Sequence, residues 1–250
     1  LNVKAQTPGL IYQPASAPGN AVLDPNGDGY TSATSAGFSG TNDGTAYSEL
    51  KMIPIPQYSS TGEPIADLST GAAGGQTDIV GGANSVYVLN DGTNLIIRFR
   101  IGKNSSASKG YCLMIDNNGK FGPTDPNYTT ANMGFELAVT LETNFRVQVR
   151  NLVTNTVVNT YTIGTHAQRS ISATTFSGNT NVFYDFYVPL TDLTTNPATA
   201  SFRFAATTIT SGNSDFPSGT LSDINGINDQ TFSGNTFAAL YTAINQCICN

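Results

Sequence analysis

Two apolar runs flank an Asn-Asp-Gly-Thr turn in the stretch VYVLNDGTNLIIRFRI, residues 86–101. Asp-Gly between apolar runs is typical of a β-hairpin, because both residues tolerate the positive backbone angles of a two-residue turn. In the second run, one face carries apolar side chains at alternate positions, namely Leu95, Ile97, Phe99 and Ile101. This period of two indicates strands with one face turned towards a core.

The same period continues outward from this hairpin. Further strands are predicted at 110–115, 135–142, 145–150, 157–163, 182–188 and 202–204. Residues 52–56 predict an extended edge segment, because its two prolines remove ladder donors. The sequence therefore predicts an all-β fold, a two-sheet antiparallel β-sandwich of jelly-roll or immunoglobulin-like type. One short C-terminal helix is expected at 236–244, where apolar residues recur at helical spacing after a capping Asn235.

Composition narrows the classes of function. The chain has 250 residues, of which 11% are charged, with a formal net charge of −6. An acidic chain without a basic cluster is a poor ligand for nucleic acid, and no apolar run is long enough to span a bilayer. We expect an N-terminal segment at 1–19, a sandwich domain at 20–232, and a helix with a cysteine-containing tail at 233–250.

Both ends of the sequence carry further expectations. Residues 1–5 read either as the remnant of a secretory signal peptide or as an ordinary flexible end. Cys247 and Cys249 are too close for an unstrained disulfide, so we expect partners further along a longer chain. Cys112 lies in an apolar run and is expected to be a small buried hydrophobe.

The loop DPNGDGY, residues 24–30, has the spacing of a calcium-binding loop. Alternate side chains and one backbone carbonyl would point at a single ion, through Asp24, Asn26, Asp28 and Tyr30. Ser35 stands where an EF-hand needs an acidic ligand, so an EF-hand proper is excluded. The alternative is a turn whose polar groups are satisfied by its own backbone.

Two weaker loops also concentrate oxygen ligands. One begins DNNGK at residue 116 and contributes the candidate metal ligands Asp116, Asn118 and Asp125. The other is DINGIND, residues 223–229. Both compositions also suit ordinary turns. If loops distant in sequence converge, their like charges require a hard cation, and Ca²⁺ is the expected ion.

Enzymatic activity is not expected. Glu136 and Glu142 share a strand face but lie about 20 Å apart at 3.3 Å per residue, too far for a glycosidase pair. Glu136 with Asp185 is an alternative pair. However, several arginines share this parity, so cross-strand ion pairs on a solvated face explain these acids better. The only histidine, His166, is interpreted as a loop residue, and no nucleophile or phosphate-binding motif is present.

Carbohydrate binding is an alternative to a purely structural role. Sugars stack on exposed aromatic rings while polar groups bind their hydroxyls. Phe183 and Tyr187 share the expected outer parity with Asp185, and these three residues are weak candidates for ligand binding. Tryptophan, the strongest platform for such stacking, is absent from the chain.

The run at 86–100, followed by LMIDNNG at 113–119, is similar to the central strands of family 9 carbohydrate-binding modules and related DOMON-type sandwiches. The stretches 116–151 and 186–193 more closely resemble modules of large surface proteins in Bacteroidota. Those proteins leave the cell by type IX secretion, and many carry a sorting or gliding-associated domain. The resemblance implies an extracellular sandwich with calcium and a role in adhesion or glycan binding.

From these observations we expect a non-catalytic, secreted or cell-surface module for adhesion or surface assembly, stabilised by calcium. Its partner would be a surface glycan or a protein of the secretion or adhesion machinery. The alternative is a carbohydrate-binding module that targets a polysaccharide-active protein.

Overall fold

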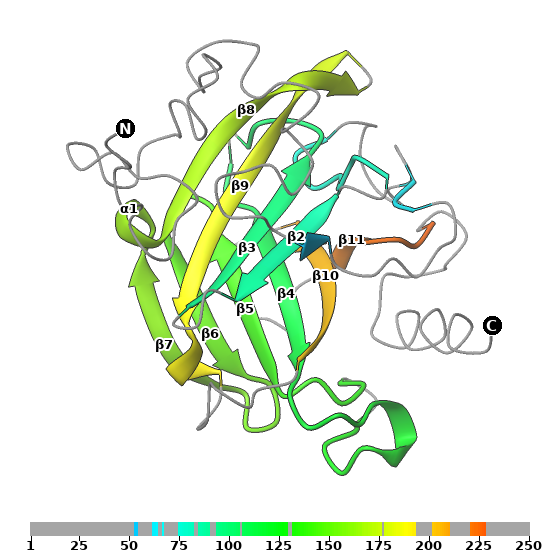
Figure 1. Ribbon diagram of the computed structural model, residues 1–250, viewed down its shortest axis with the longest axis vertical. Helices are drawn as coiled ribbons and strands as arrows, with labels where there is room; N and C mark the ends of the chain where they lie inside the picture. The colour runs from blue at the N-terminus through cyan, green and yellow to red at the C-terminus, as the bar shows by residue number, and fades with distance from the viewer. Residues whose placement is uncertain are drawn as a thin grey trace, which may run out of the picture.

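The computed structural model describes most of the chain between residues 53 and 228 (Figure 1). The described residues are 53–54, 62–64, 67, 75–82, 85–90, 94–105, 107–129, 132–176, 178–193, 202–210 and 221–228. The expected segments 1–19 and 233–250, the helix at 236–244, the loop at 24–30 and the two C-terminal cysteines lie outside these residues. The division into those segments and a sandwich domain therefore stays a prediction.

The described strands form two antiparallel sheets, as predicted. The five-stranded sheet has the order β1-β2-β3-β9-β8. Its strands are β1 (Ile53–Pro54), β2 (Val86–Asn90), β3 (Asn94–Ile101), β9 (Asn179–Pro189) and β8 (Ala167–Phe176). The six-stranded sheet has the order β11-β10-β4-β5-β6-β7. Its strands are β11 (Leu221–Ile224), β10 (Arg203–Ile209), β4 (Gly110–Asp116), β5 (Leu137–Glu142), β6 (Arg146–Asn151) and β7 (Thr156–Thr162).

Helical structure in the described residues is brief. One turn, α1 (Ile163–His166), joins β7 to β8, and two 3-10 turns are η1 (Gly122–Thr124) and η2 (Leu190–Asp192). None of the helices described here is long and apolar enough to cross a membrane.

The predicted hairpin is confirmed in its two strands, which pair from Val86 opposite Phe99 to Asn90 opposite Leu95. The predicted edge segment is also confirmed, because β1 lies at the margin of the five-stranded sheet and pairs only with β2 in the described part of the chain. Strand β8 was not predicted, and β11 lies where the sequence suggested the start of a loop.

The main core lies between the two sheets. Phe99 of β3 stacks at 5.9 Å on Tyr111 of β4, which belongs to the opposite sheet. Tyr184 of β9 contacts the same tyrosine at 4.7 Å between ring centroids. The side chains predicted to share one face of β3 are all in this core, so the alternation was interpreted correctly.

The other face of each sheet is also buried to a large extent. On the six-stranded sheet, Met114, Phe135 and Ile224 belong to a second apolar cluster. Cys112 lies in it as the expected buried hydrophobe, and burial raises the pKa of its thiol to about 12. The sheets therefore have apolar residues on both faces, and alternation alone did not reveal this.

The expectation of a solvated outer face is wrong for the five-stranded sheet. Arg98 and Asp185 lie opposite one another on β3 and β9 and form two hydrogen bonds, of 2.7 and 3.2 Å. Cross-strand ion pairs were expected on a solvated face, whereas both side chains of this pair are buried. The Arg98 guanidinium also lies 4.6 Å from the centre of the Phe183 ring, which is fully buried. The sequence does carry a signal that this face is covered, because apolar Ile96 and Phe183 lie on it among the charged residues.

Candidate metal centre

Three carboxylates from two distant parts of the chain meet inside the protein. Each of Glu63, Asp67 and Asp223 offers one oxygen, and these oxygens all lie within 4.8 Å of one another. Their side chains are at most 3% exposed. We call these three residues the acid cluster. Among the described residues it is the only such group of three metal-binding side chains.

The strand β11 places Asp223 in this cluster. Asp223 pairs with Thr208 of β10, and its backbone carbonyl accepts a 2.6 Å hydrogen bond from the Thr207 hydroxyl. Its carboxylate Oδ2 accepts a 2.6 Å hydrogen bond from the backbone N–H of Ile79. The aspartate therefore ties the edge of the six-stranded sheet to the segment that precedes β2.

Glu63 is held by two further segments. Its backbone N–H donates to the carbonyl of Gly82 at 3.2 Å, in an isolated antiparallel bridge. Its carboxylate accepts a hydrogen bond from the backbone N–H of Gly226. Glu63, Ile79 and Gly226 thus belong to three separate segments that converge on the acid cluster.

Buried hydroxyl and amide groups connect the same segments. Thr77 and Ser222 join their hydroxyls at 2.8 Å, and the Thr208 hydroxyl donates to the Thr77 carbonyl at 2.6 Å. The Ser85 hydroxyl donates to the Asn225 amide oxygen at 2.5 Å. This edge of the sandwich is therefore fastened by polar contacts, and the geometry of the cluster is fixed from several sides.

The chemistry of the acid cluster is that of a hard cation site. Two unit charges 4.8 Å apart repel by roughly 3.5 kcal/mol at an effective dielectric constant of 20. Hydrogen-bond donors, a proton or a bound cation can relieve this repulsion. Carboxylate oxygens are the ligands that Ca²⁺ and Mg²⁺ prefer, whereas zinc sites use mainly nitrogen and sulfur. The acid cluster can therefore hold a metal ion.

Sequence reasoning found one of these three residues. Asp223 begins the third oxygen-rich loop of the sequence, whereas Glu63 and Asp67 lie in a stretch that was interpreted as a long loop. The only signal for Glu63 was the rarity of glutamate in this chain, and no signal pointed to Asp67. The first predicted calcium ligands, Asp24, Asn26, Asp28 and Tyr30, lie outside the described residues.

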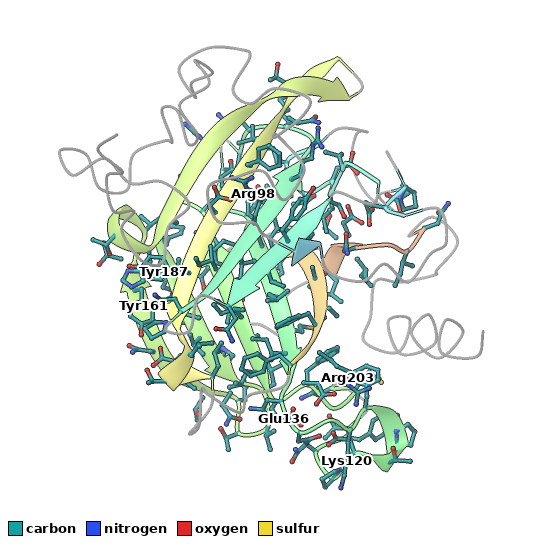
Figure 2. All side chains as sticks on the ribbon, in the orientation of Figure 1. Arg98, Lys120, Glu136, Tyr161, Tyr187 and Arg203 are labelled. Atoms are coloured by element: carbon teal, nitrogen blue, oxygen red, sulfur yellow. The ribbon has the colours of Figure 1, made fainter. Side chains whose placement is uncertain are left out.

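The second predicted loop is ordered around Glu136, close to Arg203 at the lower end of the view in Figure 2. Asp116 accepts hydrogen bonds from the backbone N–H groups of Asn118 and Gly119, at 3.0 and 2.9 Å. Its other oxygen lies 2.8 Å from Nε of Arg203, with which it pairs across strands. This aspartate thus closes an Asx turn and an ion pair.

Glu136 is the centre of that loop. Its Oε1 accepts hydrogen bonds from the side-chain amides of Asn118 and Asn127, at 2.5 and 3.1 Å, and its Oε2 accepts one from the N–H of Asn117. Burial raises the pKa of Glu136, and the nearby Asp116 and Asp125 add to the shift, while the amide hydrogen bonds oppose it. Asp125 joins the loop by accepting the N–H of Asn127 at 2.5 Å. The three predicted ligands are thus brought together, and each takes part in hydrogen bonds of the loop itself.

The residues proposed for ligand contact have different surroundings. Phe183 and Asp185 are fully buried, so neither offers a surface to a ligand in this structure. Tyr187 is partly buried and stacks on His166 at 4.3 Å between ring centroids.

Comparison with protein-family models, with curated proteins and with solved structures gives no match.

Proposed function

We propose that this chain is a non-catalytic, secreted or cell-surface β-sandwich module for adhesion or surface assembly, and that it is stabilised by Ca²⁺. The observation that carries the proposal is the buried acid cluster of Glu63, Asp67 and Asp223. Asp223 lies more than a hundred positions after Glu63 and Asp67 in the sequence, so an ion held there links two distant segments of the described fold.

Calcium fits this cluster better than other common ions. Its ligands are oxygens only, which disfavours zinc and copper. Magnesium binds with near-ideal octahedral geometry and keeps several waters, which a buried site at the margin of a sheet does not readily accommodate. Calcium accepts irregular geometry, and backbone carbonyls can complete its shell.

The ion would stabilise the folded state by joining distant segments of the chain. The unfolded chain does not bring Glu63, Ile79 and Asp223 together, so calcium binds the folded state and stabilises it by mass action. At a free calcium concentration 100 times the dissociation constant, this linkage contributes about 2.7 kcal/mol. Such a device suits the calcium-rich medium outside a cell.

The arrangement of the acids supports a non-catalytic role. Acids that catalyse glycoside hydrolysis flank an open substrate site at about 5–10 Å. The acid cluster is instead buried, and its members accept hydrogen bonds from backbone N–H groups. The alternative pair does not meet, because Glu136 precedes β5 of one sheet while Asp185 of β9 is bonded to Arg98 in the other.

Calcium binding to defined variants tests the proposal. Wild-type protein is freed of metal with a chelator and titrated with calcium by calorimetry, together with the variants Asp223→Asn and Asp125→Asn. We expect one site that Asp223→Asn weakens at least tenfold and that Asp125→Asn leaves unchanged.

The second variant is the matched control, because it removes the same charge from the Glu136 loop. If Asp125→Asn abolishes binding while Asp223→Asn retains it, the ion belongs to that loop and the acid-cluster assignment is wrong. If wild-type protein binds no calcium, the stabilising role of calcium is rejected.

A further inference from the structure

The strand β7 forms an exposed edge of the six-stranded sheet, on the left side of the view in Figure 1. Six of its seven residues are exposed, and it pairs only with β6 among the described strands. A strand at an edge presents backbone N–H and C=O groups that a further strand can bind. The edge at β7 is therefore a candidate surface for strand addition.

The sequence of β7 lacks the features that usually prevent strand addition. Exposed edges commonly carry a charged side chain or a proline, and β7, with the sequence TVVNTYT, contains neither. The other described edges differ from it. The strand β1 has two residues and ends at Pro54, β8 contains Arg169, and all four residues of β11 are buried. Val158 is displaced by a shift of register, but residues 159–162 pair regularly with β6.

Exposed apolar side chains follow the same edge. Among the described residues, the large apolar side chains that are exposed are Phe145, Val153, Val157 and Val158. The last two belong to β7 itself and are 47% and 46% exposed. Val153 lies in the turn that leads into β7, and Phe145 precedes β6, beside the other end of β7. Exposed apolar groups that gather in one place mark a surface of interaction.

Contacts behind β7 hold its second half in place. The Tyr161 hydroxyl donates a 2.5 Å hydrogen bond to Asp192, and its ring stacks on His166 at 4.2 Å. The Asn159 side chain donates to the Tyr161 hydroxyl at 2.8 Å and accepts the N–H of Thr160 at 2.9 Å. The strand is therefore pre-organised, which lowers the entropy cost of binding a partner.

A second copy of this chain fits the edge. Identical strands that pair antiparallel are related by a two-fold axis, and the absence of charge in β7 means that no like charges face one another across it. Such pairing brings Val157 and Val158 of one copy towards the Phe145 end of the other. A hollow of about 370 Å³, lined by Phe145, Thr160 and Thr162 among others, opens at that end and has room for a valine side chain.

We propose that β7 pairs antiparallel with β7 of a second copy, so that the two six-stranded sheets join into one continuous sheet. The inference rests on the surface-assembly role proposed above. It does not rest on calcium, because the acid cluster lies at β11, the opposite edge of the sheet. Since β11 is buried, the joined sheet ends there in both copies, and the assembly closes as a dimer.

The dimer is expected to be weak. A contact through one seven-residue strand is smaller than a standard protein interface of about 1,600 Å². The monomer, with β7 exposed, therefore prevails in dilute solution, and the dimer forms as the concentration rises. Display on a surface would raise the effective concentration of neighbouring copies and favour the pairing.

Sedimentation velocity of the whole chain, from about 5 to about 500 μM, tests the proposal. We expect a reversible monomer–dimer equilibrium that Thr160→Lys weakens at least tenfold, because the substitution places two like charges near the two-fold axis. Thr124→Lys is the matched control, since Thr124 is also an exposed threonine but lies in η1, outside β7. It dimerises as the wild type does, and thermal melts verify that both variants are folded.

Hydrogen exchange at the two ends of this concentration range locates the contact. The β7 amides should exchange more slowly at the high concentration, whereas those of β11 stay the same. Association is measured in calcium and in chelator. Equal association in both media separates this proposal from the calcium proposal, because a chain that binds no calcium still dimerises.

Three results overturn the inference. The first is a wild type that stays monomeric over the whole range, which would leave the edge to a strand of another protein. The second is a Thr160→Lys variant that associates as tightly as Thr124→Lys. The third is a dimer in which the β7 amides gain no protection, because its contact would then lie elsewhere.

Discussion

The two edges of the six-stranded sheet are built from opposite kinds of residue. At one edge, all four residues of β11 are buried, and Asp223 lies among hydroxyls, amides and two other carboxylates. At the other edge, six of the seven residues of β7 are exposed, and Phe145 in the turn between β5 and β6 is 54% exposed. One edge therefore buries charged groups that join distant segments, whereas the other edge remains exposed.

The largest contrast between the edges is expected from truncation of an apolar side chain. Ile224→Ala in β11 removes a fully buried group and leaves a cavity, which costs about 2–5 kcal/mol of the free energy of unfolding. Val158→Ala in β7 removes a side chain that is 46% exposed and changes that free energy by at most about 0.5 kcal/mol. Urea denaturation of both variants measures the difference. Equal losses would show that β7 is covered in solution.

Chelation of calcium is expected to affect one edge only. Adding a chelator to calcium-loaded protein removes about 2–3 kcal/mol of linkage free energy at near-saturating calcium. Hydrogen exchange should accelerate at the Ile79 and Gly226 amides, which donate to carboxylates of the acid cluster. Exchange of the β6–β7 amides, including that of Phe145, stays the same. Uniform acceleration over the whole sheet would contradict a local role for the ion.

A smaller effect is expected at the turn that presents Phe145. Asn144 adopts a φ of 77°, a left-handed conformation that asparagine tolerates and alanine does not. Asn144→Ala should therefore cost about 1 kcal/mol of unfolding free energy, while Asn144→Gly changes it little. Thermal melts compare the two variants with wild type. Equal stability of Asn144→Ala and Asn144→Gly would show that the left-handed conformation of residue 144 is not required in solution.

The smallest effect concerns pH at the β7 edge. Burial lowers the pKa of His166 below its usual 6.5, against the opposing charge of Asp192, in a stack between Tyr161 and Tyr187. The unfolded chain therefore takes up the proton first as pH falls. The stabilisation that the neutral His166 ring contributes to the free energy of unfolding is complete above pH 6.5. It is lost as the pH falls below that value.

Urea midpoints at about pH 7.5 and about pH 5.5 measure this loss, with His166→Gln as the control. The wild-type midpoint should fall further than that of the variant. A larger fall in His166→Gln would mean that protonated His166 is favoured in the folded state.

The sequence predicts the fold well because alternation is a local signal. The spacing of Leu95, Ile97 and Phe99 alone predicts a face turned towards the core, and the structure confirms this prediction. The alternation of apolar and polar residues does not show whether the other face of a sheet is exposed to solvent. Arg98 and Asp185 form a cross-strand ion pair of the kind expected, yet both side chains are buried, because burial depends on what covers the sheet.

The acid cluster was harder to predict, because Asp223 lies far along the chain from Glu63 and Asp67. Asp223 belongs to a recognisable oxygen-rich loop, but Glu63 and Asp67 have no motif that points to it. The residues predicted as ligands at 116–125 do lie in one loop. Their carboxylates accept hydrogen bonds from backbone N–H groups of that loop.

The assignment of calcium to the acid cluster is tested by the unfolding free energies of wild-type protein and Asp223→Asn, each measured in chelator and in calcium. We expect the substitution to change this free energy in opposite directions in the two media. In chelator the variant is at least as stable as wild type, because one of three mutually repelling buried charges is gone while its remaining oxygen still accepts the Ile79 N–H. In calcium the wild type gains about 2–3 kcal/mol and the variant gains little. If both proteins respond equally to calcium, or if the variant is less stable in both media by the same amount, the acid cluster is not a calcium site.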